Sequence, residues 1–179
     1  MSGYDGVVLA GGHGRRMGTG SKQLLAVGGR PMIAASLAAV AGARRIVVVG
    51  PGGDLVEDPP GGGPVAALAA ALTRVTAPVV VVLASDLPFV SAAVVDLLVA
   101  RAPAVAVDAD GRAQPLLAAY RTMGLRQAIP AQPAGAAMRT VVDALAPKAR
   151  LVEIAAAGAP PAWWDCDTPA QLKQARSWA

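Results

Sequence analysis

The stretch VVLAGGHGRRMGTGSK, residues 7–22, joins a short apolar run to a glycine-rich segment that contains two arginines and closes on a lysine. Glycine permits positive φ angles and lets backbone N–H groups approach a ligand closely. Successive N–H groups in such a turn form a concave site for an anion, and Arg16 and Lys22 add positive charge nearby. The glycines concerned are Gly11, Gly12 and Gly14. The stretch therefore predicts a buried strand that leads into an anion-binding loop.

This loop differs from two common phosphate-binding motifs. It lacks the Gly-Lys-Ser/Thr ending of the Walker loop. Gly12-His13-Gly14 is followed by Arg-Arg-Met, whereas the dinucleotide fingerprint continues with x-x-Gly and opens a helix. The alternative to an anion site is a plain connecting loop with solvated arginines.

Short runs of β-branched residues alternate along the chain with alanine-rich stretches of helical length. Continuous apolar runs bounded by Gly or Pro are typical of strands covered on both faces. The expected strands are 6–10, 45–49, 78–83, 105–107, 116–120 and 150–154. The expected helices are 31–41, 64–75, 91–100, a helix that ends within 141–145, and 169–177. Pro31 and Pro64 are expected in the first turns of their helices, and Ser91 is expected to cap the helix that follows it.

Strands and helices that alternate at this spacing predict right-handed crossovers and an open, mainly parallel sheet. The predicted fold class is α/β, a single Rossmann-like domain over residues 1–179 with three layers in the order helix, sheet, helix. The Pro- and Gly-rich segment 54–63 is interpreted as an active-site loop. Ligands in such sheets bind beyond the carboxyl ends of the strands, which is where the first glycine-rich loop falls.

The composition excludes several classes of protein. Apolar residues make up 54% of the chain but aromatic residues only 3%, so the core must consist of Val, Leu and Ala. Cys166 and His13 are the only cysteine and histidine, which excludes an internal disulfide, a thiolate-rich metal site and a histidine-based zinc site. No apolar run approaches the roughly 20 residues of a membrane span, and the N-terminus lacks the features of a secretion signal. We expect a cytoplasmic protein without membrane association.

The net charge of +4 raises the question of nucleic acid as a partner. The basic residues are scattered along the chain, however, and aromatic residues that could stack on bases are few. A small anionic substrate explains the charge equally well. We therefore expect no nucleic-acid partner.

The pattern Leu9-Ala10-Gly11-Gly12-x-x-Arg15-Arg16-Met17-Gly18-x-x-x-Lys22 resembles the signature of the MobA-like nucleotidyltransferases. The likeness continues, in order, over nearly the whole chain. It is carried by the segments 28–32, 62–64, 85–89, 114–116 and 167–169. Within the family, Leu-Ala-Gly-Gly is similar to the molybdenum cofactor guanylyltransferases, whereas the cytidylyl relatives usually carry Leu-Ala-Ala-Gly.

The resemblance implies transfer of a nucleoside monophosphate to a phosphorylated acceptor with release of pyrophosphate. For the guanylyl members, the phosphate of molybdopterin attacks the α-phosphate of GTP, and transient contact with molybdoenzymes or their chaperones is expected. The residues implied in nucleotide binding are Leu9, Ala10, Gly11, Gly12, Lys22, Asp58, Gly63 and Asp86. The implied catalytic residues are Arg16 and Lys22, which would neutralise phosphate charge, and Asp86, which would hold Mg²⁺.

The ending Asp165-Cys166-Asp167-Thr168-Pro169 departs from the Asn-x-Asn-Thr-Pro common in the guanylyl members and is closer to the Asp-x-Asp-Thr-Pro of cytidylyl relatives. The resemblance implies that Asp165 and Asp167 contact the acceptor, and Asp167 is a second candidate ligand of Mg²⁺. Alternatively, Asp167 or Thr168 caps the last helix at Pro169. A cap and a metal ligand can coexist in one segment.

Two other functions remain open from the sequence. The same fold could serve a cytidylyltransferase or a transferase that acts on a sugar or alcohol phosphate. The chain could also be a non-catalytic protein that binds a nucleotide or cofactor and delivers it to another protein. Arg16, Lys22 and Asp86 favour catalysis, although binding alone would use the same groups.

Overall fold

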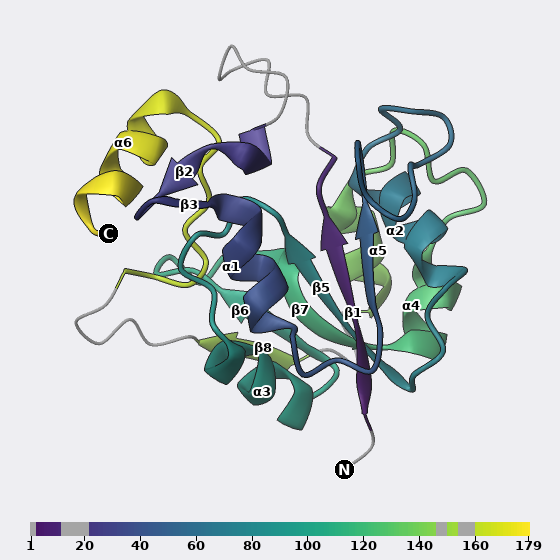
Figure 1. The fold of residues 1–179 in the computed structure, drawn as a ribbon. Helices are drawn as coiled ribbons and strands as arrows, with labels where there is room; N and C mark the ends of the chain where they lie inside the picture. Colours follow the sequence, from purple (N-terminus) through teal and green to yellow (C-terminus); the bar gives the residue numbers. More distant parts are fainter. Residues whose placement is uncertain (1–2, 12–21, 146–149, 154–159) are drawn as a thin grey trace.

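The computed structural model describes residues 3–11, 22–145, 150–153 and 160–179, and its centre is a six-stranded sheet (Figure 1). The strands are β1 (Tyr4–Leu9), β4 (Ile46–Val49), β5 (Val79–Ala84), β6 (Ala104–Val107), β7 (Ala113–Arg121) and β8 (Arg150–Glu153). Their order across the sheet is β4-β1-β5-β7-β6-β8. Within this sheet, β7 is antiparallel to its neighbours β5 and β6, and the other pairs are parallel. The predicted mainly parallel sheet is confirmed.

Helices cover both faces of this sheet, which confirms the three-layer arrangement (Figure 1). One face carries α1 (Met32–Ala39) and α3 (Ala92–Ala100). The other carries α2 (Pro64–Leu72), α4 (Thr122–Ala128) and α5 (Met138–Leu145). A last helix, α6 (Pro169–Ser177), lies beside a small antiparallel pair, β2 (Ala26–Val27) and β3 (Arg30–Pro31). None of the helices in the described ranges is long and apolar enough to cross a membrane.

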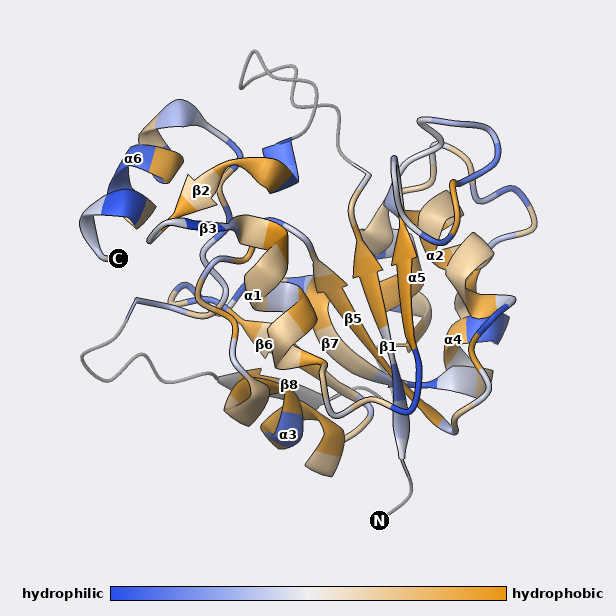
Figure 2. Ribbon diagram, in the orientation of Figure 1, coloured by the Kyte–Doolittle hydropathy of each residue, from blue (hydrophilic) through white to orange (hydrophobic). Residues whose placement is uncertain are grey.

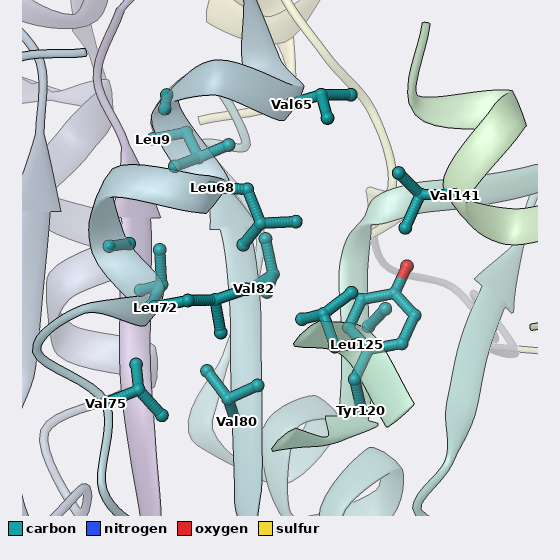
Figure 3. Packing of buried hydrophobic residues seen from close by; sticks show 14 of the residues in the cluster. Leu9, Val65, Leu68, Leu72, Val75, Val80, Val82, Tyr120, Leu125 and Val141 are labelled. Carbon is teal, nitrogen blue, oxygen red and sulfur yellow. The ribbon is translucent and has the colours of Figure 1, made fainter. Parts of the chain in front are cut away.

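Strand β5, at the centre of the sheet, is apolar along its whole length because both of its faces are buried. In β5, Val80 and Val82 belong to the core under α2, α4 and α5, whereas Val81 and Leu83 belong to the core under α1 and α3. Figure 2 shows the resulting hydrophobic colour along β5, and Figure 3 shows Val80 and Val82 packed near Tyr120. A fully buried valine contributes about 1.5–3 kcal/mol relative to an exposed one, so this sheet is the rigid base on which the connecting loops rest.

The local signals for helix starts are confirmed in part. Pro64 begins α2 directly after Gly63, whose φ of 89° favours glycine. Thr168 caps α6, because its Oγ1 accepts a hydrogen bond from the Gln171 N–H at 3.2 Å. Two expectations are wrong in detail. Pro31 is the residue before α1 and not part of its first turn. Ser91 precedes α3, but its side chain makes no capping hydrogen bond.

Helix α4 and the β2–β3 pair are among the elements that were not predicted from the sequence. Helix α4 has seven residues and includes Gly124, so its pattern is too short and too weak to indicate a helix. It starts at Thr122, whose Oγ1 donates to the Ala77 carbonyl at 2.6 Å, and tertiary contact therefore fixes its position. The β2–β3 pair has only two residues in each strand. Neither element changes the fold class.

Candidate functional site

Strands β1 and β5 end beside each other, so the segments that follow them are neighbours. Leu9 pairs with Ala84 at the last position of each strand. The Ser85 N–H donates to the Leu9 carbonyl at 3.1 Å, and Ser36 Oγ of α1 donates to the Ala84 carbonyl at 2.8 Å. These contacts fix the turn after β5. Asp86, the next residue, consequently lies at the carboxyl edge of the sheet and lines the cavity there.

Three charged side chains from distant parts of the sequence meet at this edge. Lys22 begins the short 3₁₀ helix η2 (Lys22–Leu24), and its Nζ lies 2.5 Å from Asp86 Oδ2 and 2.5 Å from Asp167 Oδ1. The side chains of Lys22 and Asp86 are 13% and 14% exposed, whereas that of Asp167 is 50% exposed. Lys22 and Asp86 were predicted to share one site, and they are in direct contact.

Asp167 reaches this cluster because α6 is held firmly against the rest of the molecule. Thr168 ends the preceding segment and caps the helix, as described above. Leu172 packs in a small core with Met32 of α1. Trp164 and Trp178 meet edge to face with ring centroids 4.8 Å apart. The contact between Lys22 and Asp167 therefore depends on tertiary packing of the last helix.

Burial and the like charges of neighbouring carboxylates alter proton affinities in this region. Burial, together with the like charges of Asp167 and Asp86, raises the pKa of Asp165 to about 6. Asp165 Oδ1 accepts a hydrogen bond from Gln171 Nε2 at 2.8 Å. For Lys22, burial acts to lower the pKa, but the two carboxylates outweigh it and the net shift is upward. Lys22 is therefore fully protonated at neutral pH.

A cavity of about 380 Å³ unites most of the predicted site residues. Those that line it are Leu9, Gly11, Lys22, Asp86, Asp165 and Asp167. Another part of the wall is formed by Gln114 to Leu117 of β7 and by Met138 of α5, residues to which the sequence analysis assigned no role. The segment 114–116 did carry a family-like motif, so the signal for this wall was present in the sequence. The cavity lining thus combines a cluster of charged side chains with mostly apolar residues from β7 and α5.

The loop that leads into α2 brings a carboxylate against Gly11. Glu57 is only 8% exposed, and its Oε1 accepts a hydrogen bond from the Gly61 N–H at 3.0 Å. A Cβ added to Gly11 would lie 3.4 Å from Glu57 Oε1, so the carboxylate backs the glycine closely. Asp58, the predicted nucleotide contact, is exposed beside it. Sequence reasoning missed Glu57, because neighbouring carboxylates in a loop look alike until their burial is known.

The start of α2 also faces the cavity. Gly63 precedes the helix, its carbonyl accepts the first-turn hydrogen bond of the Ala67 N–H at 3.0 Å, and Pro64 lines the cavity wall. A helix N-terminus favours negative charge because its first N–H groups point outward. The predicted residues Gly12 and Arg16 lie outside the described residues, as does His13.

The donor set is consistent with a magnesium ion. The described residues contain no group of three or more His, Cys, Asp or Glu side chains arranged to hold a metal. Mg²⁺ does not require such a group, because it commonly takes one or two carboxylates and completes its coordination with water and phosphate oxygens. Asp86 and Asp167 already converge on one positive charge, the Lys22 ammonium. These two carboxylates therefore fit the ion.

Comparison with known proteins identifies the family and shows a shared fold. The family described as "MobA-like NTP transferase domain" matches residues 6–149. Among solved structures, the molybdopterin-guanine dinucleotide biosynthesis protein A of Archaeoglobus fulgidus is 22% identical, with 97% of each chain covered and a TM-score of 0.72. The 2-C-methyl-D-erythritol 4-phosphate cytidylyltransferase of Thermus thermophilus is 24% identical, with 96% of each chain covered and a TM-score of 0.67.

A nucleotidyl transferase from Methanothermobacter is 21% identical to this chain and has a TM-score of 0.75. The match covers 99% of this chain and 97% of that protein. No curated protein sequence matches the chain significantly. At these identities the solved structures establish the shared fold. They include proteins that use different nucleotides, so the likeness does not select one of them.

Proposed function

Because the chain belongs to the family of MobA-like NTP transferase domains, we propose that it is a Mg²⁺-dependent guanylyltransferase of molybdenum cofactor maturation. In this reaction a phosphate oxygen of the molybdopterin acceptor forms a bond to the α-phosphorus of GTP. The bond from that phosphorus to the bridging oxygen breaks, and pyrophosphate leaves. The observation that carries the proposal is the convergence of Lys22, Asp86 and Asp167 in one cavity beyond the strand ends.

The protein's own groups would act mainly by positioning the phosphates and neutralising their charge. The backbone from Leu9 to Gly12 would hold the nucleotide, and the N-terminus of α2 at Gly63 would favour the negative charge of the phosphates. Lys22 and Arg16 would neutralise the pyrophosphate as it leaves. No general base is needed, because the acceptor phosphate is already ionised at neutral pH.

Asp86 would be the principal ligand of Mg²⁺ and Asp167 the second. Bound there, Mg²⁺ would supply charge neutralisation for the phosphates during transfer. Asp165, which lines the same cavity and is held by Gln171, would face the acceptor together with Asp167. Asp58, exposed beside the buried Glu57, would contact the nucleoside end of GTP. Molybdoenzymes or their chaperones would receive the product in transient contacts.

A second candidate, a cytidylyltransferase or a transferase for a sugar or alcohol phosphate, is favoured by one observation. The Asp165-Cys166-Asp167 segment is closer to cytidylyl relatives, while Leu-Ala-Gly-Gly favours the guanylyl members. A delivery protein without turnover would use the same binding groups. The three functions differ in nucleotide preference and in turnover.

Thermal-shift titration with GTP, CTP and UTP in the presence of Mg²⁺ tests the nucleotide. We expect GTP to stabilise the protein most, and Asp58→Asn to weaken GTP binding. A preference for CTP would replace the guanylyl proposal with the cytidylyl one, and unchanged GTP affinity in Asp58→Asn would remove that residue from the site. Pyrophosphate release with purified molybdopterin then separates an enzyme from a delivery protein.

A further inference from the structure

We propose that Lys22 is an exchangeable counter-ion. In the absence of nucleotide, its ammonium holds the position between Asp86 and Asp167 and competes with the divalent cation for it. The triphosphate then draws the ammonium away and opens the position to the metal. This inference rests on the proposed function in that it takes Asp86 and Asp167 as the ligands of the cation.

The geometry supports competition for a single position. Both carboxylates use one oxygen each to contact the same nitrogen atom, Lys22 Nζ, at 2.5 Å. A divalent cation and an ammonium would repel each other at such short range. A cation bound by the two carboxylates therefore requires the ammonium to leave.

The charges that line the cavity explain why the free protein needs a positive side chain where the metal would bind. Among the described residues that line it, Asp86, Asp165 and Asp167 are acidic and Lys22 alone is basic. Without a metal, the partly buried Asp86 would be costly to leave unpaired. Lys22 satisfies it in the free protein, and a divalent cation would satisfy it in the loaded one.

The lysine is also suited to change partners. Its ammonium is a compact charge on a long stem and can donate to any oxygen acceptor within reach. In the described part of the chain, the hydrogen-bond and ion-pair partners of Lys22 Nζ are these two carboxylates, and none of them is a backbone group. Gly11 and Pro64, which mark the expected phosphate region, line the same cavity. Triphosphate oxygens there would offer the ammonium new acceptors without requiring the backbone to move.

This exchange makes metal and nucleotide binding mutually dependent. When one ligand has displaced the Lys22 ammonium, the other binds without that cost in free energy. By linkage, the metal increases the affinity for the nucleotide by the same factor as the nucleotide increases the affinity for the metal. The free protein should consequently bind a divalent cation weakly. Removing the lysine charge should strengthen binding of the cation alone.

The decisive experiment is a titration of the nucleotide-free, full-length protein with Mn²⁺, followed by electron paramagnetic resonance of the free ion. We expect Lys22→Met and Lys22→Gln to bind Mn²⁺ at least about tenfold more tightly than the unaltered protein. Asp86→Asn, alone or combined with Lys22→Met, should lose Mn²⁺ binding at this position, because it removes one of the two carboxylates. Lys173→Met removes an exposed lysine of α6 and serves as the matched control, with unchanged Mn²⁺ affinity expected.

Equal or weaker Mn²⁺ binding in folded Lys22 variants would overturn the exchange. A gain of the same size in Lys173→Met would also overturn it, because net charge alone would then explain the result. The titration contains no nucleotide, so its outcome is separate from that of the proposed function. A tenfold gain together with a preference for CTP would keep the exchange and reject the guanylyl reaction.

Discussion

Asp5 and Asp86 are two acidic residues at opposite ends of a pair of neighbouring strands. Asp5 lies near the amino end of β1, and Asp86 follows the carboxyl end of β5. Asp5 is 1% exposed, and its Oδ2 accepts hydrogen bonds from the Thr76 and Ala77 N–H groups at 2.7 and 2.9 Å. Asp86 instead contacts the ammonium of Lys22 beside a cavity. The partners of Asp5 are fixed in the backbone, whereas the partner of Asp86 is a side chain that can move.

This difference indicates that the two ends of the sheet have separate tasks. At the amino end, a carboxylate with backbone donors ties the segment between α2 and β5 to β1. At the carboxyl end, charged side chains meet around a cavity and can exchange partners. Stability should therefore depend most on Asp5, and ligand binding on Asp86.

The largest expected effect belongs to Asp86→Asn. Pyrophosphate release should fall by about 10²–10³-fold, the range found when one preorganised charge-stabilising contact is removed from an active site. The free energy of unfolding should change by no more than about 1 kcal/mol, because the amide oxygen can still accept from the Lys22 ammonium, which also keeps Asp167 as its partner. Steady-state assay and urea denaturation measure the two quantities. Asp110→Asn, in an exposed loop, is the control.

If Asp86→Asn retained full activity, or if it unfolded the protein, the division between the two ends of the sheet would be wrong. In the first case Asp86 would have no part in transfer. In the second it would resemble Asp5. Normal activity in Asp110→Asn is needed to attribute the loss to the site.

Asp5→Ala should produce the next largest effect, a loss of about 2–4 kcal/mol in the free energy of unfolding. The substitution leaves the Thr76 and Ala77 N–H groups without their acceptor in a buried place. Asp5→Asn should cost less, because its amide oxygen can still accept both hydrogen bonds. Urea denaturation of the two variants measures the difference. Equal losses would show that the charge of Asp5, and not its hydrogen bonds, stabilises the fold.

Much of the fold could be predicted from the sequence because the central strands are buried on both faces. The valine run of β5 and the apolar second half of β1 have few alternatives to a covered strand. The reversed direction of β7 could not be read from its residues, since strand direction depends on how the connecting segments pass over the sheet. Helix α4 was missed because its start is fixed by the contact of Thr122 with a neighbouring strand end.

The candidate site was predictable to a similar extent. The position of Asp86 follows from a strand that ends at a turn, and the structure places it beside Lys22 as expected. The contact of Lys22 with Asp167 joins residues 145 positions apart, and it exists only because α6 packs against α1 and β2. The burial of Glu57 beside the exposed Asp58 is likewise a tertiary property. Local motifs therefore identify the residues, and packing determines which of them meet.

The smallest expected effect is on the pH dependence of the free energy of unfolding, and it concerns Asp165. This residue adds a third carboxylate to the comparison of Asp5 with Asp86. Its pKa is about 6 in the folded protein, above the ordinary value of 3.8, because burial and the nearby Asp167 and Asp86 disfavour its charge. Between about pH 4 and pH 6 the unfolded chain has lost this proton while the folded protein still holds it. By linkage, the contribution of Asp165 to the free energy of unfolding falls as pH rises through this window.

Asp165→Asn should therefore match the unaltered protein near pH 4 and exceed it in stability near pH 7. Because the side chain is partly exposed, solvent screening should limit the gain to about 1 kcal/mol. The variant keeps an oxygen for the hydrogen bond from Gln171, so the gain would reflect charge alone. Urea denaturation at the two pH values measures it, with Asp110→Asn as the exposed control. A gain that is equal at both pH values would contradict the assignment, because only a carboxylate that titrates between them can produce the difference.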